Sequence, residues 1–381
     1  MPASSWILQL AGAAVVALAL LELACRVRLH RGGYFVWPRY FRRVIILDPE
    51  TFPQLPGVAA FEGNADGERG LPCPTGHGVR RILAVGGSTV ESALNDQPAS
   101  WPAQAQALLN RPDALAKLRA AYIHVGNVGR SGMDVPAVAY VLEKSLPRYP
   151  RLPGIWMMVG PGDLLRWLEE GAPAEAVIQP LDVHRCFGEN PEVEFGLHPL
   201  RTGIATQLKR LRLTMLRPVE RREKAGRWMK RARELRRNAE RFITEMPDST
   251  AFLKRFEDDL DAAVRRATAA ADQVVLIRQP VFRKASYTPE EDALFWNGGI
   301  GNAYDGDDVK VFFSTEVILR LLDLIEQRIA RVAEKHGAVF VDTLPRITMS
   351  SATFYDHFHL TPKGAKDLAS AVAEAVLADD R

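Results

Sequence analysis

The stretch RRILAVGGST, residues 80–89, is a nearly continuous apolar run that ends in two glycines and a serine. A run of this kind is expected for a strand that is buried on both faces of a parallel sheet. The Gly-Gly-Ser turn puts Ser88 just beyond the carboxyl end of that strand. Ligands of open α/β sheets bind outside these strand ends, so Ser88 is a candidate site residue.

Four more apolar runs follow the first, and stretches with the apolar spacing of amphipathic helices lie between them. Alternating strands and helices predict right-handed crossovers. We therefore predict an α/β fold, a three-layer α/β/α sandwich with a five-stranded parallel sheet. The predicted strands are 80–87, 122–127, 155–160, 273–281 and 338–344, and the predicted helices are 101–110, 135–146, 316–337 and a last helix from Pro362, with Thr361 as its N-cap.

The N-terminal segment 1–25 has no charged residue from Ser4 until Glu22. About 20 helical residues span a hydrocarbon core of roughly 30 Å, so this segment predicts one transmembrane helix, from about Trp6 to Ala24. A cleaved signal peptide is the alternative. It is disfavoured because no Lys or Arg precedes the apolar run, as the first region of a signal peptide requires.

Arginines follow the predicted membrane helix, whereas the side before it is uncharged apart from the terminal amine. The positive-inside rule therefore predicts a single-pass protein with its large C-terminal part in the cytoplasm. A periplasmic C-terminal part is the alternative. The same arginines favour an anionic leaflet surface. They are Arg26, Arg28, Arg31, Arg39, Arg42 and Arg43.

The charge of the chain is unevenly distributed. Residues 207–241 hold fourteen Lys or Arg and four Glu, so this segment carries +10 although the whole chain carries +3. It lies in a gap between the third and fourth strands that far exceeds one crossover helix, which predicts a basic helical insertion at about 165–272. The basic segment is interpreted either as a solvated helix or as a face that meets anionic lipid or an acidic protein. No nucleic-acid partner is predicted, because no binding motif accompanies the charge.

Composition and short motifs exclude several classes of site. The chain has 47% hydrophobic residues and only three cysteines without a CxxC pair, so it is globular and has neither a disulfide framework nor a cysteine-based zinc site. No P-loop or GxGxxG signature is present. Residues 26–60 mix aromatics, prolines and glycines, and this predicts an irregular juxtamembrane arm.

The stretch YDHFHLTPKG, residues 355–364, brings Asp356, His357 and His359 together before a predicted helix start. Three interpretations are open: a metal site, one end of a catalytic triad, or a loop with incidental histidines. The metal site is disfavoured because no second group of ligands lies nearby in the sequence. A serine nucleophile, in contrast, needs such a base, together with donors for the oxyanion that forms.

Four blocks in this order resemble the SGNH (GDSL-like) hydrolase family, in its membrane-anchored bacterial branch with a GGST first block. They are GGST, NVGRSGMD, VGPGDLL and YDHFHLTPKG, preceded by the lead-in NADGERG, and the resemblance covers roughly residues 61–378 outside the insertion. It implies an SGNH-hydrolase-like domain over 61–381 with the flavodoxin-like arrangement of the family, in the bacterial inner membrane. It implies no metal and no organic cofactor.

Carried over by position, the resemblance assigns Ser88 as nucleophile, His359 as general base and Asp356 as the residue that orients the base. The oxyanion donors would be the N–H groups of Ser88 and Gly132, with Gly162 at the third position. The family has an asparagine where this chain has Gly162, and losing one oxyanion donor costs about 10²- to 10³-fold in rate. We therefore expect Gly162→Asn to raise the activity if the site is otherwise assembled.

Two functions are compatible with these residues. The first is a membrane-anchored serine hydrolase that cleaves or transfers an ester-linked acyl group of a carbohydrate or lipid. The second is a catalytically weak or inactive SGNH-like domain that serves as a subunit of a larger membrane complex and docks through the basic insertion and the arm. The intact Ser88, Asp356 and His359 favour the first function, and Gly162 favours the second.

Overall fold

The computed structural model describes residues 3–175, 180–191, 202–215, 219–303, 306 and 308–378. Its centre is a five-stranded parallel sheet with strand order β10-β8-β5-β3-β4, which confirms the predicted α/β fold. In chain order these five strands run 2-1-3-4-5, the flavodoxin-like order. Their bounds are β3 Val79–Gly86, β4 Tyr122–Asn127, β5 Leu152–Met158, β8 Ala271–Ile277 and β10 Val339–Val341.

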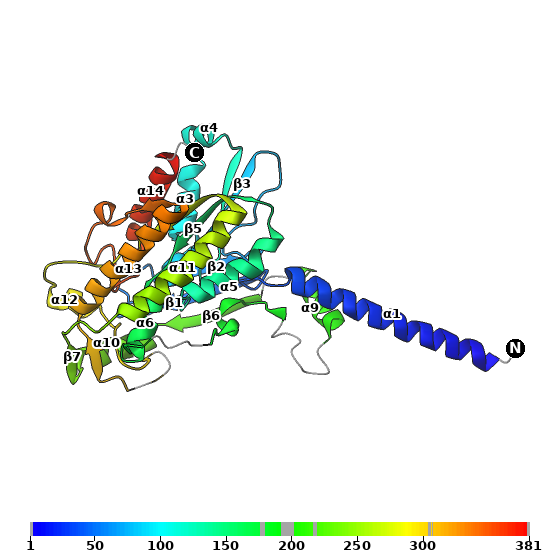
Figure 1. Ribbon diagram of the computed structural model, residues 1–381, viewed down its shortest axis with the longest axis horizontal. Coiled ribbons are helices and arrows are strands. Elements are labelled where there is room, and N and C mark those ends of the chain that lie inside the picture. The colour runs from blue at the N-terminus through cyan, green and yellow to red at the C-terminus, as the bar shows by residue number, and fades with distance from the viewer. Residues whose placement is uncertain are drawn as a thin grey trace.

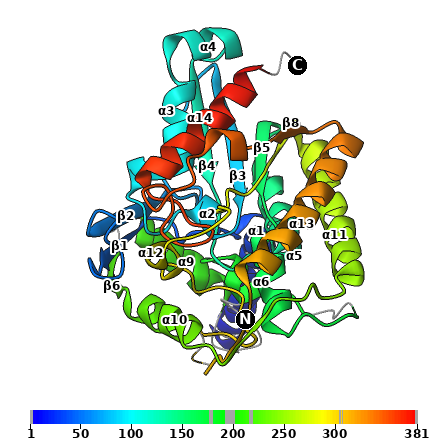
Figure 2. The ribbon, with the colours of Figure 1, turned by 90° about the vertical axis from the view of Figure 1, so that its left-hand side faces the viewer.

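Helices cover both faces of this sheet, as Figure 2 shows. On one face, α11 packs against α5 and α13, and on the other α14 packs against α3. The inner residues of the strands are almost all buried in the two resulting cores. The helices are α3 Trp101–Leu109, α4 Pro112–Leu118, α5 Val135–Ser145, α11 Thr250–Ala270, α13 Thr315–His336 and α14 Pro362–Ala378.

The prediction of an irregular arm over residues 26–60 is wrong. The arm contains β1 (Phe41–Leu47) and β2 (Val58–Gly63), which pair with each other antiparallel. Strand β1 also pairs in parallel with β6 (Val219–Ala225), so a second sheet of order β2-β1-β6 forms. The prolines and glycines lie before β1 or in the turn between β1 and β2. The third strand comes from a segment about 180 residues later, which local sequence patterns do not reveal.

The predicted insertion at about 165–272 is also corrected. Helix α6 (Pro161–Glu169) follows β5 directly, and α11 is the crossover helix that leads into β8. The inserted segment is therefore residues 170–249. It is only partly helical, because it also supplies β6 and β7. Its elements are α7 Val183–Cys186, α9 Gly203–Met215, β6, α10 Arg227–Arg237 and β7 Arg241–Ile243, the last paired with β9 Val311–Phe313.

Helix α1 (Ala3–Gly32) projects from the body of the protein, as Figure 1 shows. Residues 6–32 are apolar enough to cross a membrane, and the most apolar window of this helix is entirely exposed. The helix continues past the predicted end at Ala24. Its length and composition fit a membrane anchor or a signal sequence. Shorter elements complete the described chain: α2 Ser88–Glu91, α12 Pro289–Asp292 and the 3₁₀ turns η1 Gln97–Ala99, η2 Leu146–Arg148 and η3 Leu344–Arg346.

Candidate active site

The turn after β3 presents Ser88 at the carboxyl edge of the sheet. Gly86 has a φ of 153°, and a Cβ there would collide with the backbone of Met158 on the neighbouring strand β5. Only glycine fits this close approach. Gly87 then caps the short helix α2, whose first residue is Ser88. Ser88 is partly exposed, so a substrate can reach its hydroxyl.

The loop before α14 brings the three predicted triad residues together. The Nε2 atom of His359 lies 2.7 Å from Ser88 Oγ, and its Nδ1 atom lies 2.7 Å from Asp356 Oδ2. An ionised carboxylate only accepts hydrogen bonds, so Nδ1 carries the hydrogen and Nε2 is free to accept the proton of Ser88. This is the connectivity of a Ser-His-Asp triad.

Asp356 is fixed by four hydrogen bonds. Its Oδ1 accepts from the backbone N–H groups of Phe358 and His359, each at 2.9 Å. Its Oδ2 accepts from the indole N–H of Trp296 at 2.9 Å and from His359. Burial alone would raise the pKa of Asp356, but the positive charge on His359 and these donors outweigh it and lower the pKa well below the ordinary value.

His359 shows the opposite balance. Burial lowers its pKa, but the charge and hydrogen bond of Asp356, with a smaller contribution from Glu91, raise the pKa above 6.5. About 17% of the side chain is exposed, next to Ser88. A histidine with a raised pKa is a stronger base, which suits the removal of a proton from a hydroxyl group.

His357 lies outside this arrangement. Its ring stacks on Phe295 with 3.8 Å between centroids, and the residue is fully buried. Burial and the nearby Arg236 guanidinium hold the pKa of His357 well below the ordinary value. Its contacts are those of a neutral packing residue. In the described part of the chain, no group of three His, Cys, Asp or Glu side chains is arranged to hold a metal ion.

The loop at the end of β4 reaches Ser88 from the other side. Gly132 is exposed with a φ of 79°, and the carbonyl of the next residue, Met133, lies 3.5 Å from where a Cβ on Gly87 would be. No hydrogen bond among the described residues uses the N–H of Ser88 or of Gly132. Both groups are therefore free to donate.

A buried carboxylate that the sequence did not reveal holds this loop. Glu91 Oε2 accepts from the N–H of Ser131 at 2.5 Å and from its hydroxyl at 2.6 Å. Glu91 Oε1 pairs with Arg43 of β1 at 3.2 Å, and Arg43 also pairs with Glu223 of β6. The second sheet is thus linked to the residue before Gly132. The only feature of the sequence that could have pointed to Glu91 is its position one helical turn after Ser88.

Gly162 leaves no room for a side chain. It is the second residue of α6, and a Cβ there would lie far closer than 3.0 Å to the carbonyl oxygen of Met133. The loops after β4 and β5 therefore touch through their backbones. The expectation that Gly162→Asn restores a third donor is corrected, because an asparagine side chain cannot start from this position without moving the Gly132 loop.

The two amides that could have replaced the missing asparagine are engaged elsewhere. Asn127 donates to the carbonyl of Val90 at 2.8 Å and accepts from the N–H of Gly129 at 2.9 Å. Gln279 donates to Thr89 Oγ1 at 3.0 Å and to the carbonyl of Phe358 at 3.3 Å. Both side chains hold the loops around Ser88 together.

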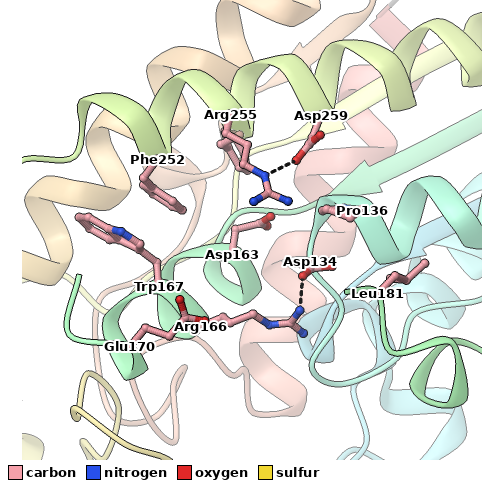
Figure 3. Close-up of a pocket in the computed structure, with 11 residues that line it drawn as sticks. Asp134, Pro136, Asp163, Arg166, Trp167, Glu170, Leu181, Phe252, Arg255 and Asp259 are labelled. Atoms are coloured by element: carbon pink, nitrogen blue, oxygen red, sulfur yellow. Dashed lines mark ion pairs between the residues drawn. The ribbon is translucent and has the colours of Figure 1, made fainter. Parts of the chain in front are cut away.

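Asp163, next to Gly162, has a structural role. Its Oδ1 accepts from the N–H of Val135 at 3.0 Å, and its Oδ2 has no hydrogen-bond partner among the described residues. Figure 3 shows it in a small cavity of about 90 Å³, where Arg166 pairs with Asp134. Burial and the neighbouring Asp134 raise its pKa well above the ordinary value. No triad residue lines this cavity.

Comparison with known proteins identifies the domain. Residues 225–374 match the model of the family described as "SGNH domain (fused to AT3 domains)". Residues 225–374 are therefore similar to an SGNH domain. The matched part of the SGNH domain includes the loop with Asp356 and His359, and Ser88 lies before it.

Solved structures that are similar to this chain include two enzymes. One is Axe2, an acetylxylan esterase from Geobacillus stearothermophilus, with 14% identity over 80% of this chain and 96% of that chain, at a TM-score of 0.42. Another is LAE5, an alpha/beta hydrolase enzyme from the metagenome of Lake Arreo, Spain, with 14% identity over 78% of this chain and 94% of that chain, also at 0.42. No curated protein matches the chain.

Proposed function

We propose that this protein is a serine hydrolase that cleaves or transfers an ester-linked acyl group through Ser88. The observation that carries this proposal is the continuous chain of hydrogen bonds from Ser88 Oγ through His359 to Asp356, with 2.7 Å in both steps. Distances of this size lie within the range that proton transfer requires. The SGNH domain supports the same chemistry at the level of an acyl-ester hydrolase-like fold.

The reaction has two halves. Ser88 Oγ attacks the ester carbonyl carbon while its proton moves to His359 Nε2, and a tetrahedral oxyanion forms. The carbon–oxygen bond to the leaving alcohol then breaks, and His359 returns the proton to that alcohol, which leaves an acyl group on Ser88. Water or an acceptor hydroxyl then attacks the acyl carbon while His359 takes its proton. The bond from the acyl carbon to Ser88 Oγ breaks, and His359 returns the proton to Ser88. Asp356 stays ionised throughout and stabilises the imidazolium.

The oxyanion is stabilised by backbone groups only. The N–H of Ser88 and the N–H of Gly132 are the two donors, and Glu91 positions the second by binding Ser131. The third donor is missing because Gly162 has no side chain, so this site works with less oxyanion stabilisation than a three-donor site. The ester would therefore be an activated or well-anchored one, such as an O-acyl group of a carbohydrate or lipid whose other contacts supply binding energy.

The same proposal includes a membrane location. Helix α1 would anchor the protein in a bacterial inner membrane, with the SGNH domain next to the bilayer. The arginines that follow the apolar run favour the cytoplasmic side. A periplasmic domain is the alternative outcome, and it would suit an envelope polysaccharide as substrate. A reporter fused after residue 381 distinguishes the two.

A serine-directed fluorophosphonate probe tests the proposal. The purified full chain is expected to be labelled, the Ser88→Ala variant is expected to lose the label, and the neighbouring Ser92→Ala variant is expected to keep it. Absence of labelling in a chain that unfolds cooperatively would overturn the hydrolase proposal. It would favour the second function, a non-catalytic subunit of a membrane complex, for which the missing side chain at Gly162 is the specific observation.

A further inference from the structure

A groove lies where α1 enters the body of the protein. It has a volume of about 690 Å³ and is bounded by the C-terminal part of α1 and by the turn η2. It is separate from Ser88 and from the cavity of Figure 3. We call it the α1 groove, and its lining residues change from apolar to basic along the helix.

The first part of the α1 groove is apolar and exposed. Leu20 and Leu23 are 62% and 58% exposed, and Val27 is 41% exposed. In a membrane anchor these residues lie at the boundary of the hydrocarbon core, because about 20 residues counted from the apolar start at Trp6 already span it. Exposed leucine side chains at this depth of the membrane would contact lipid acyl chains.

The second part is basic. Arg28 and Arg31 are exposed, one helical turn apart on α1. Arg148 faces them from η2, and its guanidinium lies 4.3 Å from the ring of Phe35. Arg148 donates through Nη1 to the carbonyl of Asp66, whereas its Nε and Nη2 atoms are buried and have no acceptor among the described residues. The described residues that line the groove include no Asp or Glu.

The acidic residue nearest in the sequence is already committed. Glu22 pairs with Arg26 at 2.6 Å and accepts from the N–H groups of Gly203 and Ile204 at the start of α9, at 2.8 and 3.0 Å. These contacts hold α9 against α1 (Figure 1). Among the described residues that line the groove, the positive charge therefore has no counter-charge, and a bound anion would supply it.

We propose that the α1 groove binds an anionic phospholipid of the bilayer. Its phosphate would lie between Arg28, Arg31 and Arg148, and one acyl chain would lie along Leu20 and Leu23. The apolar residues of α1 precede its basic residues, just as the acyl chains of a lipid lie deeper in the membrane than its headgroup. A free anion or an acidic protein would make no use of the apolar part. The inference rests on the proposal that α1 is a membrane anchor, but it is independent of Ser88.

Native mass spectrometry of the full chain in detergent tests the inference. Phosphatidylglycerol is expected to be retained more strongly than phosphatidylcholine. The double variant Arg28→Gln/Arg31→Gln is expected to bind phosphatidylglycerol about 25-fold more weakly, since each basic residue at an anionic surface contributes roughly 5-fold. The matched control Lys209→Gln/Arg212→Gln removes two exposed charges from α9 and is expected to leave binding unchanged.

Other results would overturn the inference. Equal retention of the two lipids would show that charge is not recognised. Equal loss in the α9 control would show general attraction to the basic insertion. Displacement of the lipid by an equal concentration of glycerophosphoglycerol, which has no acyl chains, would show an anion site without a lipid contribution. Arg148→Lys keeps the charge but not the planar donor group, and a several-fold loss in that variant, with unchanged thermal unfolding, would support contact of Arg148 with the phosphate.

Discussion

The two sides of Ser88 are built by different means. On one side, hydrogen bonds of the Asp356 carboxylate hold the base. Both carboxylate oxygens of Asp356 accept hydrogen bonds, and one of them bonds to the ring of His359. On the other side, the loops with Gly132 and Gly162 approach each other closely at their backbones, and one carboxylate, Glu91, fixes the Gly132 loop. The base side is therefore specified by polar side chains, and the oxyanion side by close backbone approach.

The largest expected effect tests the base side. Asp356→Asn should lower kcat by roughly 10⁴-fold, the size found in triads where the amide stabilises the wrong tautomer of the histidine. The measurement is the rate of hydrolysis of an activated acetyl ester by the full chain, with the thermal unfolding of both proteins compared. A loss below about tenfold would mean that His359 keeps its tautomer without Asp356, and the contrast between the two sides would fail.

The next prediction tests the oxyanion side. Glu91→Gln should lower kcat/KM by about 10- to 100-fold, because a hydrogen bond to a charged group contributes about 1.5–3 kcal/mol and here it orients Gly132. The variant should also move the acid limb of the pH profile. Glu91 raises the pKa of His359, so its neutral replacement lowers that pKa, and the neutral base persists to lower pH.

This pH shift separates two roles of Glu91. Asp356 is the larger contributor to the raised pKa of His359, and it is not altered in the variant. If the rate falls while the acid limb stays in place, Glu91 acts only through the loop. Arg43→Lys, which keeps a positive charge beside Glu91, serves as the control and should retain most of the activity.

The smallest expected effect tests the close contact between the loop with Gly132 and the loop with Gly162. Gly162→Asn should destabilise the protein by about 1–3 kcal/mol, as overpacking typically does, and should lower the activity. Chemical denaturation with a paired activity assay measures both. Gly337→Asn is the matched control, since that glycine ends α13 at a φ of 62° in open space, where asparagine is tolerated. Higher activity in Gly162→Asn would show that the loops separate easily.

The same contrast explains how far the sequence could be interpreted. The five strands and Ser88, Asp356 and His359 were identified because buried parallel strands have long apolar runs and because polar side chains form recognisable motifs. The structure brings these three residues together as the sequence suggested. Contacts made by backbones leave no such trace, so the proximity of Gly162 to Met133 was not foreseen.

Pairing over long sequence distance was the second reason for errors. Strand β6 was missed because most of its residues are charged and its partner β1 lies far away in the chain. Strand β1 was missed because it lies among prolines and glycines that indicate irregular structure. Helix α11 was assigned to the insertion because several helices lie between β5 and β8. The number of residues between these strands does not show which helix is the crossover helix. Glu91 and Trp296 act through contacts with residues that are remote in the sequence, and nothing in their local sequence marks them.

The pairing of β1 with β6 sets an order of events during synthesis. Arg43 and its partner Glu223 are 180 residues apart, so at about 5–20 residues per second the ribosome delivers β6 on the order of ten to forty seconds after β1. During that interval β1 has an open edge next to the segment that enters the membrane. Arg43, which pairs with the carboxylate of Glu91, reaches its final position only after β6 has paired with this edge of β1. The oxyanion loop would therefore be fixed before the ribosome delivers Asp356 and His359, which complete the site.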